Sequence, residues 1–78
     1  MAELVAYLAR QLVDEPDAVR VEEEREDGVI VLRLHVAAAD VGKVIGRQGR
    51  VARALRAIVR AGAGRRRERM VLEIVEPE

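Results

Sequence analysis

Residues 41–51 read Val-Gly-Lys-Val-Ile-Gly-Arg-Gln-Gly-Arg-Val and combine closely spaced glycines with basic and apolar side chains. Gly46 and Gly49 bound a turn, and because neither glycine carries a Cβ, another backbone can approach the turn closely. The helix that is expected to follow would direct unpaired N–H groups toward an anion. The residues around the turn are cationic, namely Lys43, Arg47, Arg50 and Arg53. A phosphodiester chain is the partner that this arrangement suits best.

A helix is predicted at the N-terminus. Over residues 2–13, leucines recur at a spacing of four, which is typical of the apolar stripe of an amphipathic helix. The stripe consists of Leu4, Leu8 and Leu12, with Val5 and Val13 alongside. Pro16 ends this helix nearby, because proline disfavours helical geometry in the residue that precedes it.

Two strands are predicted between this helix and the glycine turn. Residues 18–25 and 29–36 alternate apolar and polar side chains, and Asp27-Gly28 between them favours a tight hairpin. The second strand shows the stronger pattern, with one apolar face formed by Ile30, Leu32, Leu34 and Val36. Arg33 and His35 share the opposite face, where we expect them to be solvated.

Two helices flank the glycine turn. The first is short, over about residues 40–46, with Asp40 as its N-cap. The second covers residues 50–61, where apolar residues recur with helical spacing at Val51, Leu55, Ile58 and Val59. Gly62-Ala63-Gly64 is predicted to end it, because glycine commonly follows a helix C-terminus.

The remaining residues complete an α+β fold. Arg65–Arg69 is predicted to be a solvated, charged loop, with a second phosphate contact as the alternative, and residues 70–75 alternate as a last strand. The order of elements is therefore α-β-β-α-α-β. Three helices packed on one face of a three-stranded sheet would bury all the apolar stripes together.

The charges are segregated along the chain although the net charge is zero. Residues 1–40 hold ten acidic and four basic residues, a balance of −6, and residues 41–78 hold ten basic and four acidic residues, a balance of +6. This pattern predicts one basic surface on a neutral protein.

The composition limits the class of protein. With 78 residues we expect a single domain over residues 1–78. Cys is absent, which removes thiolate chemistry and fits a reducing, cytoplasmic compartment. The N-terminal residues show neither a signal peptide nor a membrane span.

An enzyme is the poorest fit to this composition. The chain contains no Ser or Thr, so a Ser/His/Asp arrangement cannot form. His35 is the only histidine, and the carboxylates are dispersed, which does not make a metal site. We therefore expect no catalytic residue, no metal and no cofactor.

The predicted run β-α-GxxG-α-β resembles a KH domain, and Val44-Ile45-Gly46 followed by Gly49 matches the signature of that family. The added helix and strand precede this core, which is similar to the type II, or prokaryotic, topology. In length the chain resembles the stand-alone bacterial KH proteins of the KhpA family, and the resemblance covers about residues 2–76. The chain differs at Ala52, where many KH domains carry an aliphatic residue, and Val51 is expected to supply the apolar contact instead.

The resemblance implies a narrow cleft that holds about four unpaired nucleotides of single-stranded RNA. It also implies a cytoplasmic RNA chaperone or post-transcriptional regulator. In this cleft, Arg47 and Gln48 would donate to phosphate oxygens, and Val44 and Ile45 would form an apolar floor with the second strand as the other wall. The expected RNA-binding residues are Lys43, Val44, Ile45, Gly46, Arg47, Gln48, Gly49, Arg50 and Arg53. Because aromatic residues make up only 1% of the chain, we expect weak, sequence-tolerant and salt-sensitive binding.

The alternative is a protein-interaction or scaffolding module. The resemblance implies self-association as a homodimer or pairing with a larger KH-containing protein, and neither excludes RNA binding. Apolar residues on the last helix, namely Val59 with Ala57 and Ala61, indicate such an interface. We expect no association with a membrane.

Overall fold

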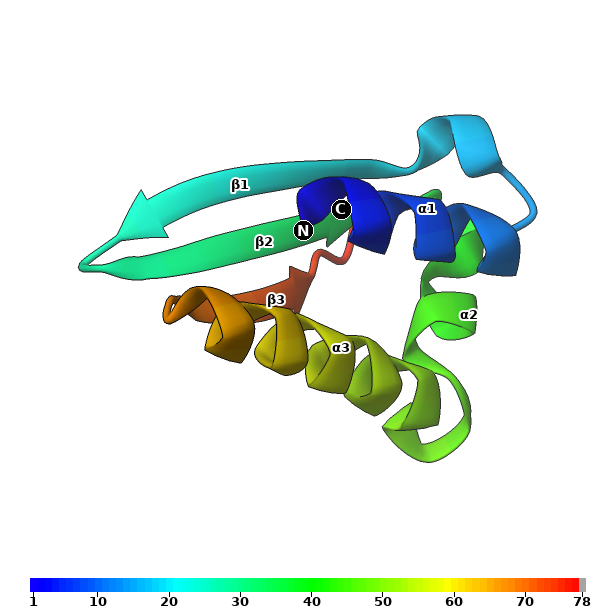
Figure 1. The fold of residues 1–78 in the computed structure, drawn as a ribbon. Coiled ribbons are helices and arrows are strands. Elements are labelled where there is room, and N and C mark those ends of the chain that lie inside the picture. The colour runs from blue at the N-terminus through cyan, green and yellow to red at the C-terminus, as the bar shows by residue number, and fades with distance from the viewer. Residues whose placement is uncertain (78) are drawn as a thin grey trace.

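The computed structural model describes residues 1–77, and Glu78, the last residue of the expected domain, lies outside the described residues. The helices are α1 (Ala2–Leu12), α2 (Val41–Ile45) and α3 (Arg50–Arg66), and the strands are β1 (Arg20–Glu26), β2 (Val29–His35) and β3 (Arg69–Ile74). This order confirms the predicted α-β-β-α-α-β succession. Figure 1 shows the helices gathered on one side of the three-stranded sheet, which confirms the α+β prediction.

β2 lies at the centre of the sheet, between β1 and β3, which form its two edges. β1 and β2 are antiparallel and meet in a tight hairpin, where Asp27 and Gly28 have φ angles of 51° and 79°. β2 and β3 are parallel, so a short hairpin cannot connect them. The connection crosses one face of the sheet and contains α2, the glycine turn and α3.

The hydrophobic core lies between the sheet and the helices. The register places Leu32 beside Leu72 and Ile30 beside Met70, and all four side chains are buried. The predicted apolar face of β2 is confirmed, because its members are buried: Ile30, Leu32, Leu34 and Val36. α3 adds a buried stripe to the same core, formed by Leu55, Val59 and Ala63.

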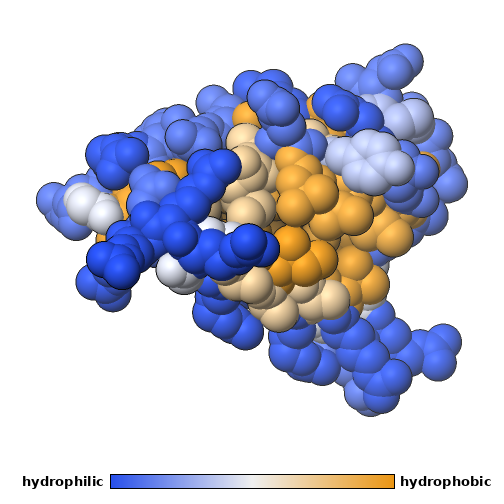
Figure 2. Space-filling model, viewed as in Figure 1, coloured by the Kyte–Doolittle hydropathy of each residue, from blue (hydrophilic) through white to orange (hydrophobic). Residues whose placement is uncertain are grey.

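Only part of the predicted apolar stripe of α1 is buried, since Val5 lies in the core and Leu8 and Val13 pack against it from partly buried positions. The buried residues of α1 are Val5, Ala6 and Ala9, whereas Leu4 and Leu12 are 43% and 40% exposed. Small side chains let the helix backbone lie close to the sheet, and the leucines flank this contact. Apolar surface therefore remains exposed on the helical side of the molecule (Figure 2).

The prediction that α3 ends at Gly62–Gly64 is wrong, because the helix continues to Arg66. A Cβ on Gly62 would collide with the terminal methyl group of Met1, so this glycine makes room for a residue from the other end of the chain. The helix ends instead at Arg67, which has a left-handed φ of 56°. The N–H of Arg67 bonds to the carbonyl of Gly64 at 3.2 Å, and the N–H of Glu68 bonds to that of Ala63 at 2.9 Å. This is a Schellman motif with arginine in the position that glycine usually occupies.

Asp40 is not the side-chain N-cap that its position predicts, because it makes no capping hydrogen bond to α2. Its carboxylate is 1% exposed and accepts hydrogen bonds from the backbone N–H groups of Asp14, at 3.2 Å, and Glu15, at 3.0 Å. Nζ of Lys43 lies 3.4 Å from the same carboxylate. Asp40 thus fastens the segment after α1 to the start of α2.

The pKa of Asp40 is set by opposing effects. Burial alone would raise it, but the two backbone donors and Lys43 together outweigh burial and hold the pKa below its usual value. A lowered pKa means that Asp40 contributes stability above its unfolded pKa, and that this contribution is lost as the pH falls through the folded pKa.

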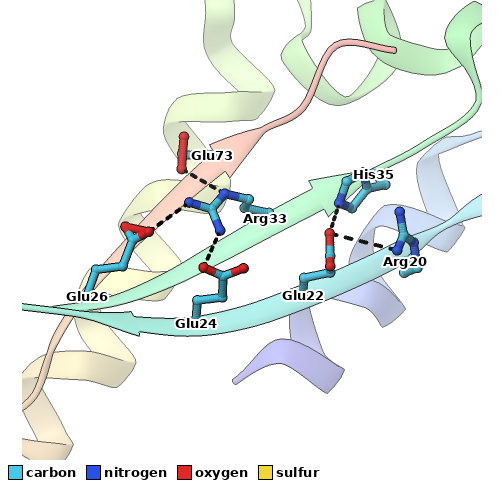
Figure 3. A network of polar contacts seen from close by, with 7 residues as sticks. All are labelled: Arg20, Glu22, Glu24, Glu26, Arg33, His35 and Glu73. Carbon is cyan, nitrogen blue, oxygen red and sulfur yellow. Dashed lines mark hydrogen bonds and ion pairs between the residues drawn. The ribbon is translucent and has the colours of Figure 1, made fainter. Parts of the chain in front are cut away.

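The sheet face opposite the helices carries a network of ion pairs (Figure 3). Arg33 reaches Glu24 at 3.0 Å and Glu26 at 3.2 Å on β1, and Glu73 at 3.3 Å on β3. Nε2 of His35 also contacts a carboxylate oxygen of Glu22. The hydrogen bonds that the Arg33 guanidinium donates to Glu24 and Glu26 raise the pKa of Arg33. Arg33 and His35 do lie on the predicted face, but they pair with acids there and are not simply solvated.

We expect Gly64→Ala to stabilise the protein. Gly64 lies inside α3, and no atom lies within 4 Å of the position that a Cβ would take. Alanine in a helix interior is favoured over glycine by about 0.5–1 kcal/mol. Urea denaturation should show a gain of this size, whereas a loss of stability would indicate that the helix ends before residue 64.

We expect Asp40→Asn to lower the melting temperature by several degrees at pH 7, because an amide cannot accept from both backbone donors while keeping the charge beside Lys43. The difference from wild type should shrink as the pH falls below the unfolded pKa of an aspartate, about 3.9, and through the lowered pKa of Asp40 in the folded protein. Asp14→Asn is the matched control, because the carboxylate of Asp14 contacts Lys43 while its backbone N–H still binds Asp40. A difference that does not change with pH, measured by thermal denaturation, would contradict this account.

Candidate nucleic-acid interface

The glycine turn lies at the surface between α2 and α3. The chain leaves α2 at Gly46, which has a φ of 77°, and Gln48 and Gly49 also adopt positive φ angles, of 58° and 74°. A hydrogen bond of 3.1 Å from the N–H of Gly49 to the carbonyl of Gly46 closes the turn. Arg47 and Gln48 are exposed at its tip.

The two glycines have different roles. A Cβ on Gly46 would lie 2.9 Å from the backbone nitrogen of Val51 and would also collide with the Val51 side chain. Gly46 is therefore required by the protein's own packing. At Gly49 the nearest atom to such a Cβ is Nη1 of Arg53, at 3.7 Å, so Gly49 leaves open space beside the turn. Of the two glycines, Gly49 is therefore the one that another backbone is expected to approach closely.

Arg47, Arg50 and Arg53 surround the turn with charge that is not neutralised. All three are exposed, and none forms an ion pair with an acid among residues 1–77. Arg53 also stabilises the turn, because its Nη1 donates to the carbonyl of Gln48 at 2.9 Å. No side-chain hydrogen bond caps the N-terminus of α3, although the N–H of Arg50 already donates to the carbonyl of Arg47.

Lys43 differs from these arginines. Its ammonium group lies 3.0 Å from Asp14 and 3.4 Å from Asp40. The hydrogen bond and charge of Asp14 raise the pKa of Lys43, and Asp40 acts in the same direction. Lys43 is thus neutralised within the protein, although the sequence suggested a free cation beside the turn.

The expected apolar floor is only partly available. Val44 is 0% exposed and packs in the core, so its side chain has no surface to offer a base. Ile45 is half-buried. Val51, beside the small and buried Ala52, packs against the core from a partly buried position.

The strand beside the helical part of the interface is β3 and not the second strand, because β2 lies in the middle of the sheet. A groove of about 240 Å³ separates α3 from β3. Its lining residues are Arg56, Val59, Arg60, Met70, Val71 and Leu72. Arg56 and Arg60 were not among the expected site residues, although they follow Arg53 at spacings of three and seven, which places them on one face of α3.

A second groove, of about 370 Å³, lies between α1 and α3 and is almost entirely apolar. Figure 2 shows the corresponding apolar surface between two hydrophilic regions. The lining residues include Leu8, Leu12, Ala54 and Ile58. Of the residues expected at an interface, Val59 is buried in the core, Ala57 and Ala61 are exposed, and none of the three lines this groove. Ile58, which was not among them, lines the groove and is 38% exposed.

Within the described part of the chain, none of the helices is both long enough and apolar enough to cross a lipid bilayer. The same residues contain no group of His, Cys, Asp and Glu side chains arranged to hold a metal ion.

Comparison with known proteins relates the chain to one family. Residues 2–74 match the model of the family described as "KhpA/KhpB, KH domain". The RNA-binding protein KhpA of Caldanaerobacter subterraneus subsp. tengcongensis is 48% identical over 75 residues, which cover 96% of this chain and 100% of that protein. RNA-binding protein KhpA of Treponema pallidum is 50% identical over 74 residues, 95% of this chain and 92% of that protein.

RNA-binding protein KhpA of Aquifex aeolicus is 46% identical over 76 residues, which cover 97% of this chain and 96% of that protein. No solved structure matches the chain. These relatives are named for RNA binding and not for a reaction. The family match over nearly the full length agrees with the order of elements and with the glycine turn between α2 and α3, and the chain belongs to the KhpA/KhpB family of KH domains.

Proposed function

We propose that this protein binds single-stranded RNA and holds about four unpaired nucleotides at the Gly46–Gly49 turn. It would act in the cytoplasm as an RNA chaperone or post-transcriptional regulator. The proposal is supported by the family and by the RNA-binding names of close relatives.

The main support is electrostatic, because Arg47, Arg50 and Arg53 are exposed and form no ion pair among the described residues, beside the N-terminus of α3, which no side chain caps. Guanidinium groups and helix N-terminal amides both bind phosphate oxygens. Gly49 leaves room for the sugar-phosphate backbone next to them. Several acids on the sheet already have a basic partner, since Glu24, Glu26 and Glu73 all contact Arg33.

The α3–β3 groove suits bases that are not paired. Its apolar residues can contact base faces, and its arginines lie along the path of the backbone. None of its lining residues is aromatic, so stacking does not contribute to affinity. A single domain would therefore bind RNA weakly and with little sequence preference.

We expect the double substitution Arg47→Asp and Gln48→Asp to lower RNA affinity more than tenfold, because it replaces attraction by repulsion at the tip of the turn. Fluorescence anisotropy with a labelled oligouridylate would measure the loss, and circular dichroism should remain native.

The chain offers a matched control, because α1 contains the same exposed dipeptide at Arg10 and Gln11. Arg10→Asp with Gln11→Asp changes the net charge equally but on another helix. Because Gln11 lines the groove between α1 and α3, the comparison uses an oligouridylate of about four nucleotides, which one domain can hold. Equal losses in the two double variants would mean that only net charge matters and that the turn is not the binding site.

A second function is favoured by the apolar groove between α1 and α3. We propose that this groove supports self-association, or pairing with a larger KH-containing protein, because Leu12 and Ile58 leave apolar surface exposed beside it. Two linked RNA sites would also bind a longer strand more tightly than one.

We expect Ile58→Glu to convert a dimer to a monomer in size-exclusion chromatography with light scattering, because a charge cannot be buried unpaired at the centre of an interface. Ala57→Glu is the control, since Ala57 is exposed on α3 but does not line the groove. A wild-type protein that stays monomeric at high concentration would end the self-association proposal without affecting RNA binding.

A further inference from the structure

The only lysine of the chain belongs to a group of three charged side chains close to the glycine turn. Nζ of Lys43 lies 3.0 Å from a carboxylate oxygen of Asp14 and 3.4 Å from one of Asp40. Lys43 is in the last turn of α2, three residues before Gly46, which corresponds to about 4.5 Å along the helix axis. In Figure 1, α2 lies between the end of α1 and the glycine turn, so this group borders the proposed RNA site.

The two carboxylates are held with different firmness. The side chain of Asp40 is 2% exposed and also accepts from the backbone N–H groups of Asp14 and Glu15, so it is fixed in place. The side chain of Asp14 is 77% exposed, and Lys43 is its one ion-pair partner among the described residues. An exposed ion pair contributes little to stability, so the contact between Asp14 and Lys43 can be exchanged for another at low cost.

The group carries an excess of negative charge. Two carboxylates share one ammonium group, and the other donors to Asp40 are neutral backbone N–H groups. Lys43 keeps its proton, because the hydrogen bond and charge of Asp14, together with those of Asp40, raise its pKa. The ammonium group also sits on a flexible stem, so it can turn from one anion to another. In the free protein, Asp14 therefore occupies a cation that a phosphate group could use.

We propose that Asp14 limits the RNA affinity of this protein because it competes with RNA for Lys43. A phosphate group of the strand at the turn replaces Asp14 as the partner of Lys43, whereas Asp40 stays in place. The inference rests on the proposed function, since the ligand is the same single strand of RNA. Asp14 lowers affinity in two ways, because its ion pair must be broken and its released carboxylate then repels the phosphate.

The test compares two substitutions in the segment after α1, with fluorescence anisotropy of a labelled oligouridylate of about four nucleotides. We expect Asp14→Asn to tighten binding about three- to fivefold, since an exposed ion pair no longer has to be broken and a repelling charge is removed. Asp17→Asn is the matched control, because Asp17 is exposed in the same segment and forms no ion pair among the described residues. It should change affinity by less than about 1.5-fold, because salt screens a charge that is not in contact. Equal gains from the two substitutions would show that only net charge matters and would overturn the proposal.

The gain from Asp14→Asn must also depend on Lys43. In a Lys43→Gln background, Asp14→Asn releases no cation, and we expect its gain to fall below about 1.5-fold. A double-mutant cycle measures such non-additivity between residues in contact. A gain of the same size with and without Lys43 would contradict the competition.

Lys43→Gln also removes the charge beside the buried Asp40, so its melting temperature is measured and the titrations are made well below it. If this background does not fold, the comparison of Asp14→Asn with Asp17→Asn decides alone. A purely structural ion pair would lower the melting temperature of Asp14→Asn without changing its affinity, and this result too would overturn the proposal.

The proposed function and this inference fail in different ways. If the Arg47 and Gln48 double variant loses binding while Asp14→Asn binds as wild type does, the turn holds RNA and the competition is wrong. If the double variant binds normally while Asp14→Asn still tightens binding through Lys43, the grip at the turn is wrong and the competition stands.

Discussion

The parallel pairing of β2 with β3 dictates the path that the chain takes between these strands. Parallel neighbours cannot be joined by a hairpin, so the chain must cross the sheet and return in the same direction. Here the crossover contains two helices, and the chain reverses between them within Gly46–Gly49. Positive φ angles and the contact with Val51 make glycine necessary at this bend. The proposed RNA site is thus located where the fold itself demands an exposed turn.

The segregation of charge becomes meaningful once the fold is known. Acids of β1 and β3 converge on Arg33 on the open face of the sheet, and Asp14 and Asp40 neutralise Lys43. The arginines of α3 have no acidic partners among the described residues, and they lie along one side of the helical layer. A protein with no net charge can therefore present a polyanion with one attractive surface, which average measures such as the isoelectric point conceal.

Sequence patterns predicted what depends on local periodicity. The two-residue alternation of β2 predicted which of its faces is buried, and the glycine spacing predicted the turn between the helices. The predictions that were wrong concern residues whose partners lie far away in the sequence. Gly62 was interpreted as a helix stop because the contact with Met1 is not visible in a local pattern. Asp40 binds the backbone at Asp14 and Glu15, so its position alone suggested a different role. The sequence also could not indicate that Lys43 is paired or that β3, and not β2, flanks α3.

The charged edge of the sheet has a consequence for behaviour at high concentration. β1 is an edge strand, and every residue from Arg20 to Glu26 except Val21 is charged, most of them glutamate. An edge strand exposes unpaired backbone groups that can recruit a strand from another molecule and start aggregation. If two β1 edges met, several glutamates would lie opposite glutamates, and like charges directly opposite are destabilising. This strand thereby protects a small domain against fibre-like growth through its sheet.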